Sequence, residues 1–279
     1  MLQNFKRVDA PQSAPISTAP MSDPLSVAVD LRDHEALDLV RHALRHKQVK
    51  LAYQPVVQTA NPDQMAFYEG LLRVHDSSGR VIPAKSFIDA VEDTEMGRIL
   101  DALALEKGLE VLAAEPGLRL AINMSARSIA YPGWKQVLDR GLQDNPTVGE
   151  RLILEITERT AITMPDLVQV FMAELQQKGI SFALDDFGAG FTSFRYLRDF
   201  YFDILKIDGE FIRGIHQNAD NQILTEAMLS LARHFDMFTV AESVESHLDA
   251  AYLASIGVDC MQGFYFGAPT INPYWQRAP

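Results

Sequence analysis

Eight short segments rich in branched aliphatic and aromatic residues constrain the fold of this sequence most strongly. Helical patterns separate all but the first two of them. Because alternating strands and helices form α/β folds, and eight such units close into a barrel, the sequence predicts a TIM-like (β/α)8 barrel. The predicted strands are 51–57, 66–74, 118–124, 151–156, 180–185, 203–207, 237–242 and 258–264, and the predicted helices are 86–114, 134–143, 165–178, 219–235 and 246–256.

The first two predicted strands break the alternation. Only residues 58–65 join them, which is too short a connection for a crossover helix. We therefore expect one antiparallel strand pair at the start of the barrel.

The N-terminal segment differs in composition from the rest. Residues 1–30 contain four prolines among Ser, Ala and Gln, so they offer little apolar surface to bury. We expect a flexible tail or linker there and a single barrel domain over 31–279. An amphipathic helix starting near Asp33 opens that domain.

Charge and cysteine content exclude several classes of protein. The sequence has 25 Lys and Arg against 37 Asp and Glu, a net charge of −12, which argues against a broad basic face and so against duplex DNA or long RNA as partners. The single Cys260 leaves no intrachain disulfide and no cysteine-based zinc cluster. No leader-like or membrane-spanning apolar run occurs, so we expect a cytoplasmic protein without a membrane partner.

Polar residues gather where the predicted strands end, the part of such a barrel that carries its chemistry. Period-two alternation adds Glu69 and Arg73 of the second strand to one face. A single Asp or Asn there is most often a helix cap or turn residue, an alternative that stays open for Asp185 and Asp186 before the glycine-rich loop. The residues at the strand ends are Asn123, Glu155, Asp185, Asp186, Lys206, Asp208, Glu242 and Gln262.

Carboxylates inside apolar runs such as LILEI need a compensating cation. The available donors are oxygen atoms without His or Cys, a set that suits Mg²⁺ or Mn²⁺. With Glu242 in reach, a pair of ions is expected. The candidate metal ligands are Glu69, Asn123, Glu155, Asp185 and Asp186.

Seven segments resemble the signature of the EAL-domain family, the cyclic-di-GMP phosphodiesterases, and they follow the family's order over about residues 50–270. A Glu-Ala-Leu triplet at 35–37 is not the matching segment, because it is not followed by Leu-Arg. The matching segments are YEGLLR (68–73), INMS (122–125), EITE (155–158), DDFGAGFTSFRYL (185–197), ILKIDGEFI (204–212), AESVE (241–245) and QGFYFGAP (262–269).

The resemblance implies an enzyme that hydrolyses cyclic-di-GMP to the linear dinucleotide pGpG with a pair of divalent ions on the candidate ligands named above. It implies that Asp186 bridges the ions or holds the second one, that Glu242 contributes nearby, and that Lys206 orients the attacking water. It further implies that Glu158 anchors the loop 186–193.

For substrate binding, the resemblance points to Gln54 and Gln262 near guanine or phosphate and to Arg73 on a phosphate, with Asp208 and Glu245 as further candidates. Gln54 is equally well explained as a core-edge amide, and Arg73 as the partner of a barrel carboxylate. The family makes its regulatory and often dimer-forming segment at 191–202, so we expect a homodimer. Control by a regulatory protein partner is a further possibility.

Three alternatives to an active phosphodiesterase stay open: a catalytically silent cyclic-di-GMP receptor, a protein-interaction module, and an enolising or lyase-type metal barrel. Family receptors typically lack one metal or lysine position, and none is lost here, which favours the enzyme. Four residues depart from the family's common choices of Ala, Leu, Thr and Gly, without removing a donor oxygen: Gly70, Met124, Ala189 and Ser243.

Overall fold

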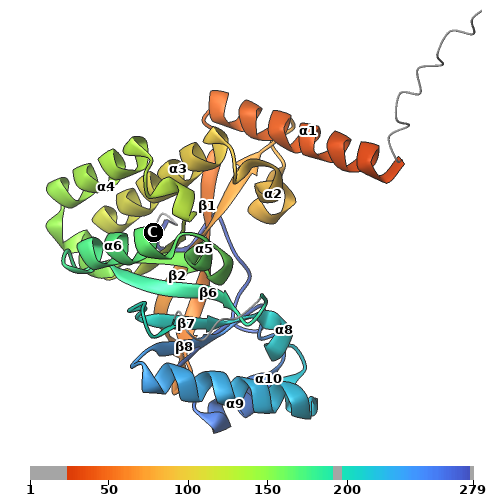
Figure 1. The fold of residues 1–279 in the computed structure, drawn as a ribbon, viewed down its shortest axis with the longest axis vertical. Coiled ribbons are helices and arrows are strands. Elements are labelled where there is room, and N and C mark those ends of the chain that lie inside the picture. The colour runs from red at the N-terminus through yellow and green to blue at the C-terminus, as the bar shows by residue number, and fades with distance from the viewer. Residues whose placement is uncertain (1–23, 191–196, 277–279) are drawn as a thin grey trace, which may run out of the picture.

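The computed structural model describes residues 24–190 and 197–276, and their strands form one closed barrel with an additional strand at its side (Figure 1). The order of the strands is β1-β9-β8-β7-β6-β5-β4-β2-β3, and a further pairing of β1 with β2 closes the barrel. The strands are β1 (Val49–Gln58), β2 (Asn61–His75), β3 (Val81–Pro83), β4 (Leu120–Asn123), β5 (Leu152–Thr157), β6 (Ser181–Phe187), β7 (Ile204–Ile207), β8 (Phe238–Ala241) and β9 (Cys260–Gln262).

The predicted barrel with its antiparallel first pair is confirmed. Strand β1 runs antiparallel to β2, with Gln54 opposite Glu69, and it is also antiparallel to β9. From β2 through β4 to β9 the neighbouring barrel strands are parallel. The carboxyl ends of these parallel strands therefore meet at one mouth of the barrel.

Helices surround the strands (Figure 1). In that view α3, α4, α5 and α6 lie around the upper half of the barrel, and α8, α9 and α10 lie around the lower half. The described α-helices are α1 (Pro24–Arg45), α2 (Ile88–Val91), α3 (Glu95–Ala114), α4 (Pro132–Asp144), α5 (Glu158–Thr163), α6 (Pro165–Gln176), α8 (Gly209–Ile212), α9 (Ala219–His234) and α10 (His247–Ile256). No described helix is long and apolar enough to cross a membrane.

The predicted helix over 86–114 is interrupted. A 3₁₀ turn (Ala84–Ser86) precedes α2, and α3 begins only at Glu95, after Thr94 in an extended conformation. Gly97 fixes this arrangement, since a Cβ there would lie 2.6 Å from the Val91 carbonyl oxygen. Strand β3 and helix α5, neither of which was predicted, add a hairpin to β2 and a short helix after β5.

Most of the expected N-terminal tail lies outside the described residues. Helix α1 starts at Pro24, inside the segment 1–30 that we expected to be tail, so the expected boundary falls within a helix. Proline is well tolerated in the first turn of a helix, where its missing N–H has no partner to lose.

The barrel interior has two layers because side chains alternate along each strand. The layer farther from the mouth is apolar and fills the barrel, with Cys260 packed against it. Two residues further along each parallel strand, toward its carboxyl end, lies a polar residue. Together these polar residues form the second layer, at the mouth. The apolar plug consists of Val56, Phe67, Ala121, Ile153, Ala183, Ile204 and Val240, and the corresponding polar layer consists of Gln54, Glu69, Asn123, Glu155, Asp185, Lys206 and Glu242, with Gln262 on β9.

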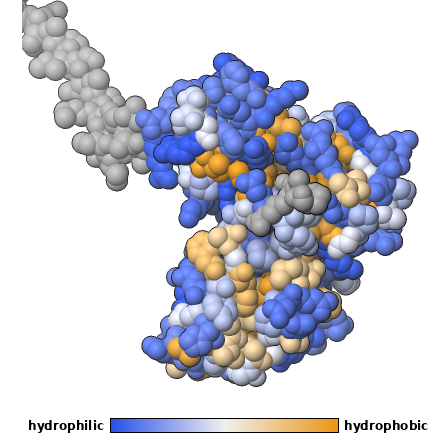
Figure 2. Space-filling model, turned by 180° about the vertical axis from the view of Figure 1, so that it is seen from behind, coloured by the Kyte–Doolittle hydropathy of each residue, from blue (hydrophilic) through white to orange (hydrophobic). Residues whose placement is uncertain are grey.

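A larger apolar core lies between the strands and the helices. Phe182 and Leu205 are fully buried there, as is Trp134 of α4. Burying each such side chain contributes about 1.5–3 kcal/mol, so this shell holds the barrel rigid around the mouth. Figure 2 shows a mainly hydrophilic outer face interrupted by apolar patches.

Candidate active site

A buried lysine stands at the centre of the polar layer. The Nζ atom of Lys206 lies 2.8 Å from Asp185 Oδ1 and 2.8 Å from Glu242 Oε1. It also lies 3.1 Å from Glu155 Oε2 and 3.6 Å from Glu69 Oε2. The lysine side chain is only 1% exposed, so this ammonium is desolvated and depends on the carboxylates around it.

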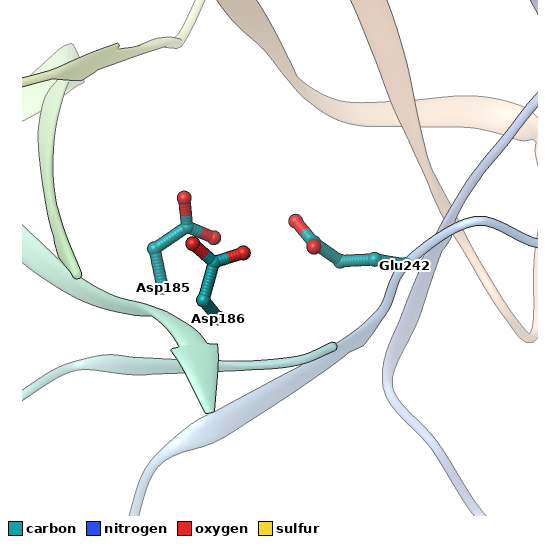
Figure 3. Close-up of side chains that lie close together, drawn as sticks. All are labelled: Asp185, Asp186 and Glu242. Carbon is teal, nitrogen blue, oxygen red and sulfur yellow. The ribbon is translucent and has the colours of Figure 1, made fainter. Parts of the chain in front are cut away.

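Two consecutive aspartates reach the same mouth because β6 is irregular where it ends. In a regular strand Asp185 and Asp186 would face opposite sides, but the register with β7 shifts between Leu184 and Phe187. Asp186 also adopts a left-handed backbone with φ of 55°. As a result carboxylate oxygens of Asp185, Asp186 and Glu242 lie within 4.8 Å of one another (Figure 3).

Amides line the other side of the cluster. Asn123 Nδ2 donates to Glu69 Oε1 at 2.8 Å, and Gln262 Nε2 donates to Glu69 Oε2 at 2.5 Å. Gln262 Nε2 also lies 3.3 Å from the side-chain oxygen of Gln54, whose own amide donates to the Gly267 carbonyl at 3.2 Å. This chain of amides fixes the orientation of Glu69.

Burial and mutual repulsion shift the pKa values of the cluster. Burial and the neighbouring carboxylates raise the pKa of Glu155 well above its usual range, and burial does the same for the pKa of Glu242 despite Lys206. Burial, with the charge of Asp185, raises the pKa of Asp186 to about 6. Burial opposes the charge of Lys206, but the surrounding carboxylates raise its pKa well above the usual value, so it stays protonated.

The donor set fits divalent cations. Five carboxylates against one ammonium leave a formal charge of −4, which two divalent ions would cancel. Glu155 Oε1 is buried and has no hydrogen-bond donor among the described residues, as expected for an oxygen kept for a cation. The described side chains that could bind a cation at this mouth offer oxygen atoms. These are hard ligands, which favours Mg²⁺ or Mn²⁺.

The cluster lies at the base of a cleft of about 790 Å³, a volume typical of small-molecule sites. Among the residues expected to bind metal or substrate, those that line it are Gln54, Glu69, Asn123, Asp185, Asp186, Glu242, Glu245 and Gln262.

Two further expected residues support the loops around the cleft. The buried Glu158, the first residue of α5, accepts a hydrogen bond at 3.3 Å from the N–H of Gly188, which lies two residues after Asp186. Residues 191–193 of the loop that it is expected to anchor lie outside the described part of the chain. Asp208 caps α8 by accepting from the Glu210 N–H at 2.6 Å and does not line the cleft.

Arg73 is, like Asp208, an expected substrate-binding residue that the structure does not bring to the cleft. Its half-buried guanidinium donates to the Leu72 carbonyl at 2.8 Å, and the residue is absent from the cleft lining. It nevertheless remains close enough to Glu69 for that negative charge to oppose the lowering of the Arg73 pKa by burial.

Sequence reasoning missed several residues of the cleft. Asp101 of α3 accepts hydrogen bonds from Ser125 N at 3.0 Å and Ser128 Oγ at 2.6 Å, and burial raises its pKa to about 6. Arg213 and Ser243 line the opposite part, joined by a hydrogen bond of 3.0 Å. Asp101 lies on α3 and Arg213 directly after α8, so neither belongs to the strand ends at which the sequence pattern predicts site residues.

Comparison with known proteins agrees with the geometry. Residues 38–269 match the EAL domain family. The chain is 31% identical over 245 residues to the cyclic di-GMP phosphodiesterase PdeF of Escherichia coli K12, covering 86% of this chain and 32% of PdeF. It is 34% identical over 237 residues to the probable cyclic di-GMP phosphodiesterase PdeN of the same organism, covering 81% and 44%. The chain thus spans 32% to 44% of the length of these relatives.

A solved structure gives the same result. The PaMucR phosphodiesterase in complex with c-di-GMP superposes with a TM-score of 0.77 at 30% identity, covering 87% of this chain and 99% of that one. The EAL domain protein from Listeria monocytogenes EGD-e superposes with a TM-score of 0.74 at 26% identity, covering 84% and 93%. With a family match over most of the barrel and the acidic mouth in place, this chain belongs to the EAL domain family, related to cyclic-di-GMP phosphodiesterases.

Proposed function

We propose that this chain is a metal-dependent phosphodiesterase that hydrolyses cyclic-di-GMP to linear pGpG. One observation carries the proposal: four carboxylates surround Lys206, and Asp186 and Asn123 lie beside them, at the base of a cleft large enough for a dinucleotide. The relative in complex with c-di-GMP shares this fold at 30% identity, which supports the same class of substrate here.

Divalent cations would supply Lewis acidity toward the phosphodiester and would lower the pKa of the attacking water. The residues proposed to hold them are Glu69, Asn123, Glu155, Asp185 and Asp186, with Glu242 beside them.

Lys206 and Glu242 have complementary roles in this proposal. Because its pKa is raised, Lys206 stays protonated and cannot act as a base, so it orients the water and offsets negative charge. Glu242, whose pKa is raised by burial, is suited to accept the proton that the water loses. Glu158 acts indirectly by holding the Gly188 N–H and with it the bend that carries Asp186.

For the substrate, we propose that Gln54 and Gln262 contact guanine or phosphate, since both amides lie in the cleft beside Glu69. Glu245 at the rim is a candidate for a base edge. Arg73 and Asp208 would reach the substrate only after a rearrangement of their present hydrogen bonds.

The test is turnover by the purified chain. With Mg²⁺ or Mn²⁺, cyclic-di-GMP should be converted to pGpG, and EDTA or Asp185→Asn should abolish the conversion. Asp38→Asn is the matched control, because this exposed aspartate of α1 pairs with Arg41 and lies outside the cleft lining. Binding of cyclic-di-GMP without hydrolysis would identify a receptor instead, and absence of binding would favour a protein-interaction barrel.

We also propose that the chain forms a homodimer. Large apolar side chains are exposed on and near α6, with Val170 at 70% and Tyr201 at 78% exposure, and Tyr201 belongs to the family's dimer-forming segment. Residues 191–196 of that segment lie outside the described residues. Light scattering should give about twice the chain mass of 31.1 kDa, and a mass of 31.1 kDa at all concentrations would contradict the dimer.

A further inference from the structure

Arg213 is one of two basic residues among the described residues that line a mainly acidic cleft. Among the described residues that line this cleft, Lys85 and Arg213 are the basic ones, against eight carboxylates. Lys206 lies below the surface, held by the carboxylates of the cluster. A dianionic dinucleotide entering this cleft therefore has few cations to meet, and Arg213 has a guanidinium suited to phosphate oxygens.

The backbone around Arg213 is fixed on both sides. Its own N–H closes α8 by donating to the Gly209 carbonyl at 3.0 Å. The next residue, Gly214, has φ of 70° and donates its N–H to Asp249 Oδ2 at 3.4 Å. Asp249 is 3% exposed and also accepts from Ser246 Oγ at 2.7 Å, which ties this turn to α10.

The side chain of Arg213 is held at the rim, but no strong ion pair occupies its guanidinium N–H groups. Its Nη2 donates to Ser243 Oγ at 3.0 Å. Its Nε lies 3.8 Å from Glu245 Oε1, and both side chains are more than half exposed, so this pairing is weak. The guanidinium therefore keeps donors available for a ligand.

Ser243 and Gly209 form a matched pair beneath the guanidinium. Ser243 directly follows Glu242 and has φ of 55°, a conformation that disfavours residues other than glycine. A Cβ on Gly209 would lie 2.4 Å from Ser243 Oγ and 3.0 Å from Arg213 Nη2. The absent side chain at position 209 thus leaves the space in which the serine hydroxyl meets the arginine.

We propose that Arg213 is a substrate-binding residue that contacts a phosphate of the dinucleotide at the cleft rim, and that Ser243 is the positioning residue that holds it there. This inference rests on the proposed function of the cleft. It adds a phosphate contact from the segment after α8, where Arg73 on β2 is turned to the Leu72 carbonyl.

The test measures turnover and binding of cyclic-di-GMP in Mg²⁺ for Arg213→Ala, Arg213→Lys and Arg41→Ala. Loss of a charge-assisted contact should raise KM and Kd about tenfold to thirtyfold in Arg213→Ala, with kcat within about twofold. Binding should weaken less steeply with added salt in Arg213→Ala, because a charged contact is lost, and the lysine variant should recover most of that salt dependence. Arg41 pairs with Asp38 on α1, outside the cleft lining, so Arg41→Ala should match the wild type.

Ser243→Ala separates the positioning role from a general effect on folding. Alone it should raise KM about threefold, since one solvent-exposed hydrogen bond from the guanidinium is lost, and it should have no further effect in the Arg213→Ala background. Equal Kd values for wild type and Arg213→Ala would overturn the inference while leaving the proposed function intact. If the wild type binds but does not hydrolyse, the Kd comparison still decides the role of Arg213. A wild type that neither binds nor hydrolyses cyclic-di-GMP would overturn both.

Discussion

Replacing Lys206 with methionine tests how the carboxylate cluster is held in the absence of metal. The ammonium lies 2.8–3.6 Å from four carboxylates, so each pair contributes about 5 kcal/mol of gross Coulomb attraction at an effective dielectric constant of 20. Desolvation offsets most of this attraction, and breaking a buried ion pair by removing one partner costs about 3–5 kcal/mol net. In EDTA at pH 7.5, Lys206→Met should therefore lower Tm by about 6–20 °C for a chain of this size.

The deficit should depend on metal and on pH. Metal at one hundred times its Kd adds about 2.7 kcal/mol to the folded state, so saturating Mg²⁺ should recover much of the lost Tm. Burial raises the pKa of Glu155 and Glu242 in the folded state above their unfolded values, so the fold takes up protons as pH falls. The stability of Lys206→Met should consequently rise as pH is lowered from 8 toward the folded pKa values.

Calorimetry of Lys206→Met and Lys135→Met in EDTA measures the effect. Lys135 lies in an exposed surface network with Asp139 and Glu174, where an ion pair is worth about 0.2–1 kcal/mol, so this control should change Tm little. A Tm for Lys206→Met within about 2 °C of the wild type, close to the effect of a single surface contact, would refute the reasoning.

Three further outcomes are expected. Because burial and Asp185 raise the pKa of Asp186 to about 6, Mg²⁺ affinity measured by calorimetric titration should fall as pH drops below 6, and a pH-independent Kd between 5 and 7.5 would contradict this. Burial also raises the pKa of Asp101 to about 6, so the wild type should lose stability as pH rises from about 4 to about 6. In thermal melts, Asp101→Asn should not show this loss of stability. Curves of Tm against pH that run parallel for the variant and the wild type would contradict the assignment of the loss to Asp101. Finally, Glu158→Gln should lower kcat about tenfold with KM nearly unchanged, since Glu158 supports the bend at Asp186 and the carboxyl acceptor of the Gly188 N–H is replaced; a change confined to KM would contradict that role.

Much of the barrel mouth was predictable from alternation along the strands. Once the strands were assigned, the period of two placed Glu69 above Phe67 and Glu155 above Ile153, with one polar and one apolar residue per strand. Three irregular features were not predictable in this way. A left-handed backbone turns Asp186 into the mouth, Arg73 folds back on its own strand, and Arg213 reaches the cleft from the end of a helix.

The fold gives Gly70 a packing role that its local sequence does not indicate. A glycine inside a strand ordinarily weakens the strand by about 0.5–1 kcal/mol relative to alanine, which is the general expectation for Gly70 in the strand that carries Glu69. In the fold a Cβ at this position would lie 2.7 Å from Ile122 Cδ1, so the glycine permits close packing of β2 against β4. Contacts of this kind depend on which side chain fills the space across the strands, which local sequence does not specify.

Hydrolysis of cyclic-di-GMP in ¹⁸O-labelled water tests the central claim most directly. The account predicts that the Mg²⁺-loaded chain forms pGpG with one ¹⁸O atom in its terminal 5′-phosphate, and that EDTA or Asp185→Asn prevents both product and label. Recovery of intact, unlabelled cyclic-di-GMP from a folded, Mg²⁺-loaded chain would contradict the claim that this cluster of carboxylates is a hydrolytic site.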